Sequence, residues 1–172
     1  MRIDTKYRDS WITIWTRLYA NDPRLEISLW ANWNQKLQIS KLMLPFVFPI
    51  RDRLDGIPGG HVNRPQNGQE FPIVDWTLLN MDDGAKIGIV CPDCYGIDGT
   101  LNVLRFTLLR SPVYAWHDPT KLDKNSFYRY TDRGEHRFRF TLMLDLDPEE
   151  LKRMALSEHR PPICYDWTKG MK

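Results

Sequence analysis

The residues with the clearest chemical potential in this sequence are its cysteines. Cys91 and Cys94 form a C-x-x-C pair, a spacing that suits half of a zinc site or a redox pair. No second pair of ligands follows at short spacing, and residues 95–99 (YGIDG) are typical of a turn. Together with Cys164 the cysteine count is three, which is odd and excludes a complete disulfide framework. We therefore interpret the pair as two small residues at a strand end.

The histidines could supply acid–base or metal chemistry, and His61 is the strongest candidate because it lies in a Gly- and Pro-rich stretch. His117 precedes Asp118, whose carboxylate could orient an imidazole, but neighbours on a strand point to opposite faces. His136 lies among aromatic residues in a predicted strand. A sugar-epimerising acid–base pair of His61 and Glu70 stays open as an alternative. No G-x-S-x-G, H-E-x-x-H, Walker A or G-x-G-x-x-G motif occurs.

Seven tryptophans give the chain a second kind of chemistry, because a flat indole can stack on the apolar face of a sugar ring. Trp33, Trp76 and Trp116 lie near predicted strand ends or loops and could make such contacts. Trp11 and Trp15 share one strand face, and we expect them to be packed. A free-standing carbohydrate-binding β-sandwich is therefore one interpretation of the sequence.

Composition limits the class of protein. The 172 residues suggest one domain, residues 1–172, or a piece of a larger one, and a hydrophobic content of 42% can fill a core. With 24 basic and 22 acidic residues the net charge is +2, which favours neither a nucleic-acid partner nor a membrane surface. The longest apolar run, near residues 42–47, is too short to span a bilayer, and residues 1–6 lack the apolar stretch of a signal peptide. The sequence leaves the localisation open.

The elements that must position these residues are mostly strands. Apolar and polar residues alternate with a period of two, as in Leu25–Trp33, where odd-numbered positions are apolar. Pro45 and Pro49 indicate an edge strand or a strand end. Residues 51–70 are predicted to form a long Gly/Pro-rich loop, a common place for function. The predicted strands cover residues 10–19, 25–33, 37–40, 42–48, 71–79, 86–91, 101–109 and 135–144.

One helix is signalled near the C-terminus. Asp147 can cap it, Pro148 suits its first position, and Glu150 has the spacing of a capping box. The prolines at residues 161–162 end it. The sequence thus predicts a mainly β fold: an antiparallel β-sandwich, or part of one, with one short C-terminal helix.

Several blocks, in the same order, resemble the C-terminal β-domain of glycoside hydrolase family 38, the α-mannosidases. Residues 101–112 (LNVLRFTLLRSP) are similar to its G-N-x-x-R-x-x-L-L-R-S-P segment, and residues 93–98 (DCYGID) to the turn before it. Residues 132–138 (DRGEHRF) resemble D-x-G-x-H-x-F. The R-P…G-E-x-P…W stretch of the family resembles residues 64–76, and its strand set ending in L-K-x-x-F-P resembles residues 18–46.

The sequence also departs from the family pattern. Asn32-Trp33-Asn34 stands where the family has Asp-Trp-His, and residues 89–93 (IVCPD) stand where it has Leu-Leu-Asn-Asp. Family members carry an upstream domain with an H-x-D zinc motif, whose zinc holds sugar hydroxyls, and a nucleophilic Asp, which forms a covalent glycosyl-enzyme. Neither motif occurs here, so we expect no catalytic residue and no metal ligand in this chain. The zinc is expected in the absent catalytic domain.

The resemblance implies a supporting role. The domain would buttress the catalytic domain of the same enzyme and shape a pocket for a mannoside-type carbohydrate, and would be inactive alone. Arg110, at a strand end, is the favoured pocket-rim residue, because a guanidinium suits bidentate contacts. Arg105, five residues earlier, is expected on the opposite strand face. A partial sandwich should also expose apolar edges and self-associate. The full set of expected substrate-binding residues is Arg110, His61, Asn63, Arg64, Trp76 and Asn102.

Overall fold

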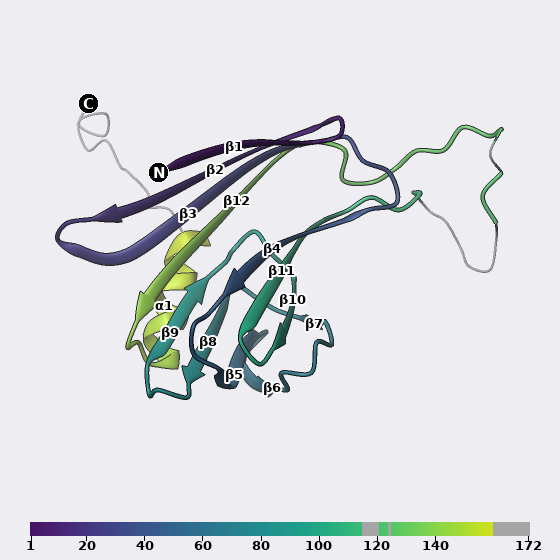
Figure 1. Cartoon of the computed structure of the whole chain (residues 1–172). Coiled ribbons are helices and arrows are strands. Elements are labelled where there is room, and N and C mark those ends of the chain that lie inside the picture. Colours follow the sequence, from purple (N-terminus) through teal and green to yellow (C-terminus); the bar gives the residue numbers. More distant parts are fainter. Residues whose placement is uncertain (115–120, 124, 160–172) are drawn as a thin grey trace, which may run out of the picture.

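Two antiparallel sheets and one helix make up the fold of the computed structural model, which describes residues 1–114, 121–123 and 125–159 (Figure 1). The mainly β prediction, with a short C-terminal helix, is confirmed. The strands are β1 (Arg2–Tyr7), β2 (Ser10–Tyr19), β3 (Asp22–Trp33), β4 (Ile39–Pro45), β5 (Ile50–Ile57), β6 (Gly60–Arg64), β7 (Phe71–Pro72), β8 (Trp76–Met81), β9 (Lys86–Val90), β10 (Gly96–Thr100), β11 (Val103–Arg110) and β12 (Gly134–Leu144), and the helix is α1 (Pro148–His159).

The larger sheet has eight strands in the order β1-β2-β3-β12-β9-β8-β5-β6, and the smaller sheet has four in the order β4-β11-β10-β7. Their inner faces meet in the main core, where alternate residues such as Leu29, Leu79, Leu104 and Phe140 are at most 4% exposed. The rings of Phe106 and Phe140 join the two sheets edge to face, with centroids 5.1 Å apart. β4 is an edge strand, as Pro45 predicted.

Helix α1 covers the outer face of the eight-stranded sheet at β8 and β9 (Figure 1). Its buried Leu151 and Ala155 pack in a second core with Trp76. The predicted capping box forms: the Glu150 amide donates to Asp147 Oδ1 at 2.8 Å, and the Asp147 amide donates to Glu150 Oε2 at 3.0 Å. The helix is therefore fixed by both its cap and its apolar face.

The prediction of a loop over residues 51–70 is wrong for most of that stretch. β5 and β6 form an antiparallel hairpin over residues 50–64. The hydrophobic pattern fails here because β5 turns two charged residues, Arg53 and Asp55, into the core. Gly56 is required within the strand, since a Cβ there would lie 2.5 Å from the Val74 carbonyl oxygen.

Three further boundaries differ from the prediction. Residues 96–100 form β10 rather than a turn, with Gly99 packed where a Cβ would meet Arg53 Nη1 at 2.8 Å. Residues 2–7 add β1, all of whose residues are exposed, so that no buried face reveals the strand. The stretch 71–79 splits into β7 and β8, because Asp75 between them adopts a left-handed φ of 64°.

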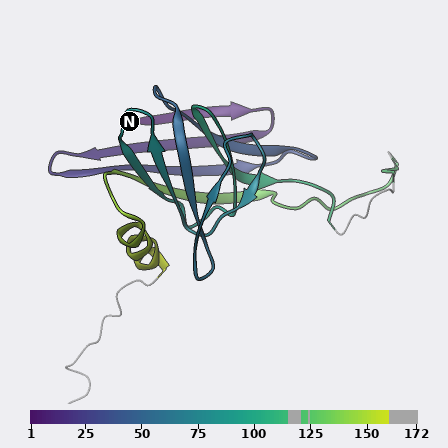
Figure 2. The same ribbon diagram turned by 90° about the horizontal axis from the view of Figure 1, so that it is seen from below.

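The strands β1, β2, β3 and β12 form a long ribbon of the eight-stranded sheet (Figures 1 and 2). The β2–β3 hairpin extends beyond the smaller sheet, so both of its faces are uncovered near the turn. Leu18 there is 74% exposed and Tyr19 is 48% exposed. Apolar side chains are thus exposed at the end of this hairpin, whereas the apolar edge expected of a partial sandwich stays a prediction.

Candidate functional site

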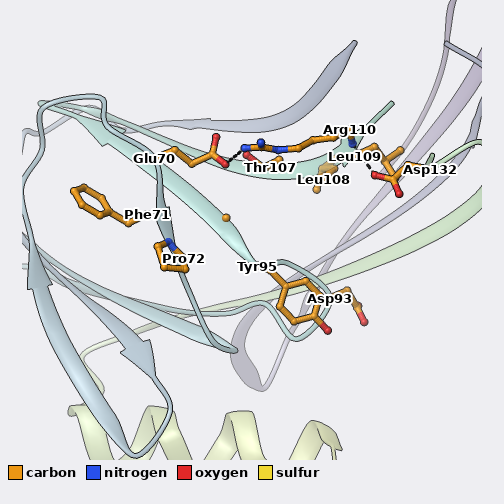
Figure 3. Close-up of a pocket in the computed structure, with 11 residues that line it drawn as sticks. Glu70, Phe71, Pro72, Asp93, Tyr95, Thr107, Leu108, Leu109, Arg110 and Asp132 are labelled. Carbon is orange, nitrogen blue, oxygen red and sulfur yellow. Dashed lines mark hydrogen bonds and ion pairs between the residues drawn. The ribbon is translucent and has the colours of Figure 1, made fainter. Parts of the chain in front are cut away.

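The cavity next to Arg110 brings four charged side chains together around open space. It has a volume of about 490 Å³ and is formed by β7, β10, β11 and the segments around Asp93 and Asp132 (Figure 3). Figure 3 shows Arg110 and Glu70 pointing toward each other on one side, with Tyr95 and Asp93 on another. The charged and aromatic side chains that line it are Glu70, Phe71, Asp93, Tyr95, Arg110 and Asp132.

A β-bulge in β11 determines where Arg110 points. The register against β4 shifts between Thr107 and Leu109, so one extra residue enters β11. The expectation that Arg105 and Arg110 lie on opposite faces is wrong for this reason. Both guanidinium groups reach the same charged cluster, since Arg105 pairs with Asp98 and Arg110 pairs with Glu70.

Lys41 connects these two ion pairs. Its Nζ lies 2.7 Å from Glu70 Oε2 and also pairs with Asp98, whose side chain is 3% exposed. Burial alone would raise the pKa of Glu70, but hydrogen bonding to Lys41 and the charges of Lys41 and Arg110 lower it below its usual range. Burial likewise opposes the charge of Lys41, yet its two carboxylate partners raise its pKa. Glu70 is therefore a charged acceptor at neutral pH rather than a proton donor.

A buried ion pair lies behind this cluster. Arg53 Nη2 is 3.0 Å from Asp55 Oδ2, and both side chains are 0% exposed. Burial lowers the pKa of Arg53 and raises that of Asp55, each partly opposed by the charge of the other. Thr77 Oγ1 donates to Asp55 Oδ1 at 2.8 Å, and the charge of Asp98 also favours the Arg53 cation. Side chains of alternating charge thus extend from the core to the cavity: Asp55, Arg53, Asp98, Lys41, Glu70 and Arg110.

Two aspartates attach the rim of the cavity to neighbouring strands. Asp132 Oδ2 accepts a hydrogen bond of 2.8 Å from the Arg110 amide. Asp93 Oδ2 accepts from the amide and Nε of Arg139, at 3.0 and 3.2 Å, at the free edge of β12. Tyr95 is 72% exposed. The cavity offers one guanidinium, three carboxylates and a phenol, a set that can both donate to and accept from hydroxyl groups.

Of the expected substrate-binding residues, only Arg110 lines this cavity. Arg64 lies behind it, with its guanidinium 4.6 Å from the centroid of the Phe71 ring. His61 lies on the helix side, with its ring 5.9 Å from that of Trp76. Exposed Asn63 is on β6, and exposed Asn102 is in the β10–β11 turn, at the opposite end of β11 from Arg110.

Trp33, Trp76 and the His61–Glu70 pair do not form a sugar site in the described part of the chain. Trp33 and Trp76 are 3% and 4% exposed, so neither can stack on a sugar. His61 contacts Trp76 while Glu70 pairs with Lys41 and Arg110, so the structure does not join His61 and Glu70. Trp116, His117, Asp118 and Cys164 lie outside the described residues.

The C-x-x-C pair is buried, with both thiols free. Burial raises the pKa of Cys91 well above its usual value and that of Cys94 to about 12. The described residues contain no group of three His, Cys, Asp or Glu side chains that could hold a metal ion. Within the same part of the chain, no helix has the length and apolar character needed to cross a membrane.

Sequence reasoning missed Asp93, Tyr95 and Asp132 as site residues. All three lie in blocks that carry the family resemblance, 93–98 and 132–138, which was the available signal. Glu70 was considered only as a partner of His61. Its pairing with Arg110, forty positions along the chain, depends on the folded sheet, in which β10 lies between β7 and β11.

Comparisons with known proteins agree with this fold. Two solved structures are similar over 88% of this chain: a glycosyl hydrolase family 38 protein from Enterococcus faecalis, at 17% identity and a TM-score of 0.68, and an alpha-mannosidase from Enterococcus faecalis V583, at 16% and 0.69. This chain spans only 18% of the length of each. A comparison with curated proteins finds no match. The family model for the glycosyl hydrolases family 38 C-terminal domain matches residues 1–120, and this chain therefore belongs to that family.

Proposed function

We propose that this chain is a non-catalytic β-sandwich of an α-mannosidase-like glycoside hydrolase. In this role it supports the catalytic domain, where zinc and the reactive carboxylates reside, and shapes the sugar pocket with the cavity at Arg110. The observation that carries the proposal is the Arg110 guanidinium, 52% exposed and held at the cavity by Glu70. Its position is fixed by the β11 bulge, so it is ready to donate without first being ordered.

The chemistry of the cavity favours a neutral polyhydroxylated ligand. Its volume of about 490 Å³ is that of a small-molecule site. Glu70 is ionised at neutral pH and can accept from a hydroxyl, while Arg110 can donate to the same or a neighbouring one. Asp93 and Asp132 add further acceptors. Vicinal hydroxyls of a mannoside need this kind of alternating donor and acceptor set.

Exposed apolar residues support a neighbouring domain as partner. The edge strand β4 and the segment after it present Met43 at 56%, Val47 at 90% and Phe48 at 50% exposure. Such a group is unusual on a free surface and is typical of a domain interface. A supporting role requires a surface of this type, which the catalytic domain of the same enzyme would cover.

The first test is catalysis by the isolated chain with added zinc. Aryl mannosides should be hydrolysed no faster than in buffer, because the proposal places the nucleophile and the metal in another domain. Zinc-dependent turnover that survives purification to constant specific activity would contradict the proposal.

The second test is sugar binding by titration calorimetry and tryptophan fluorescence. A mannoside should bind in the millimolar range, about 4 kcal/mol, since half of the pocket is missing. Arg110→Ala should abolish this binding, whereas Arg129→Ala, an exposed arginine outside the cavity, should preserve it. Equal binding by both variants would remove Arg110 from the site. Binding much tighter than about 1 mM would instead favour a free-standing carbohydrate-binding module.

A further inference from the structure

A second cavity lies on the outer face of the β2–β3–β12 ribbon. Its volume is about 580 Å³. Side chains of cross-strand neighbours explain the hollow: Ser28 on β3 stands between Trp15 on β2 and Arg139 on β12. The small serine forms a floor between two large side chains whose strands are about 10 Å apart, two strand spacings. We call this surface the ribbon groove, defined by Trp15, Arg17, Ser28, Trp30, Arg137 and Arg139.

The walls of the ribbon groove are aromatic and basic. Trp15 and Trp30 are both partly exposed, and no described residue accepts a hydrogen bond from either indole nitrogen. Arg17 and Arg137 are exposed and form no ion pair with any described residue. Glu26, the cross-strand neighbour of Arg17, instead accepts a hydrogen bond of 3.2 Å from the Tyr19 hydroxyl. Two free guanidinium groups therefore flank two flat rings, and the Arg2 guanidinium, which pairs with Asp4, already lies 5.7 Å from the centroid of the Trp15 ring.

The third arginine of the groove is held in place. Arg139 pairs with Asp93 at 3.2 Å and with Glu158 of α1 at 3.1 Å. Among the described residues, Asp93 is the only acidic one that lines the groove, and it is paired with Arg139. Of the described residues that line the groove, three are arginines and one is an aspartate, whereas the cavity at Arg110 has one arginine and, besides Asp93, the carboxylates of Glu70 and Asp132.

We propose that the ribbon groove binds an anionic oligosaccharide, with carboxylate groups on the two free arginines and a sugar ring on Trp30. Arginine suits a carboxylate because its parallel N–H groups match the two oxygens. Indole faces suit the apolar side of a pyranose ring, and their free N–H groups can donate to hydroxyls. A nucleic acid fits less well, because the whole chain has a net charge of only +2.

The inference does not depend on the proposed mannoside cavity, which lies elsewhere and has the opposite charge. The two surfaces share only Asp93. Arg110→Ala should therefore leave binding in the ribbon groove unchanged, and failure at one site is distinguishable from failure at the other.

The test is calorimetric titration of the isolated chain with oligogalacturonate at low salt, with circular dichroism to confirm folding. We expect a dissociation constant below about 1 mM that weakens with added salt, as for exposed charges. The double variant Arg17→Gln/Arg137→Gln should bind at least about tenfold more weakly. Arg129→Gln/Arg153→Gln removes the same charge from exposed arginines outside the groove, and should change affinity less than about twofold.

Separate ligands identify which part of the chemistry matters. Neutral oligomannose of equal length and free citrate should each bind much more weakly than oligogalacturonate. Oligomannose lacks the carboxylate groups, and citrate lacks the sugar rings. Trp30→Leu should weaken binding of oligogalacturonate. The proposal is overturned by no binding, by equal losses in the two double variants, by equal binding of the neutral oligomer or citrate, or by tighter binding of a single-stranded oligonucleotide.

Discussion

Two ion pairs in this sandwich have the same chemistry and opposite surroundings. The Arg53–Asp55 side chains are both 0% exposed, whereas Arg110 is 52% and Glu70 is 29% exposed. A buried pair cannot lose one member without leaving an unpaired charge in the core. A pair at a cavity can exchange its partner for a ligand at little cost. We therefore regard Arg53–Asp55, the inner pair, as part of the fold, and Arg110–Glu70, the outer pair, as a candidate for binding.

Asp98 and Lys41 join the two pairs. Asp98 is nearly buried, favours the Arg53 cation on one side and pairs with Lys41 on the other. Lys41 then holds Glu70, the partner of Arg110. Because the outer carboxylate has two cationic partners, it keeps one of them when Arg110 turns toward a ligand.

The largest effect is expected from Arg53→Met, which leaves Asp55 buried and unpaired. We expect a loss of about 3–5 kcal/mol in the free energy of unfolding, measured by urea denaturation. Arg51→Met is the matched control. Arg51 is 60% exposed beside Asp52, and its replacement should cost less than about 1 kcal/mol. Equal losses in the two variants would show that burial does not distinguish these pairs.

A smaller loss in the free energy of unfolding is expected from Gly99→Ala, which crowds the buried Arg53–Asp55 pair. The new Cβ would overlap Gln66 Oε1 and lie 2.8 Å from Arg53 Nη1, so these side chains must shift. Overpacking of this kind costs about 1–3 kcal/mol. Gly60→Ala meets no atom within 4 Å and should be near neutral in the same denaturation experiment. A neutral Gly99→Ala would mean that Gln66 and Arg53 are loosely held.

The two pairs also show what could be predicted from sequence. Strands β2, β9 and β12 were predicted within a residue of their observed bounds, and β12 shows the alternation of apolar and polar residues that predicts a strand. β5 was missed because its inward residues are Arg53 and Asp55, and a pattern of apolar residues cannot show that two charges will neutralise each other in a core.

The site was predictable only where a motif lay on one strand. Arg110 was expected at a pocket because it ends a strand in a recognised block. Its neighbours Glu70, Asp93 and Asp132 come from three other segments, and only the folded sheet brings them together. The β11 bulge, which determines the direction of the Arg110 side chain, is not marked by any pattern in the sequence.

The pH dependence of stability tests whether the charge of Glu70 stabilises the fold. The folded pKa of Glu70 lies below its usual value of 4.5, so the unfolded chain takes up the proton more readily. Its stabilisation is complete above pH 4.5 and is lost as the pH falls through the lowered pKa. Glu70→Gln should be about 1 kcal/mol less stable than the parent at pH 6.5, and the difference should shrink by pH 3. A constant difference across this range would show that the charge of Glu70 does not contribute.

The smallest effect on stability is expected from Arg110→Ala. Its guanidinium is half exposed, and Glu70 keeps Lys41 as a partner, so the free energy of unfolding should change by less than about 0.5 kcal/mol. The same variant should lose all measurable mannoside binding. This combination distinguishes a binding residue from a structural one, because Arg53→Met would lower stability first and affect binding only through unfolding. If Arg110→Ala instead destabilises the chain by several kcal/mol, the outer pair belongs with the inner one and the cavity loses its proposed donor.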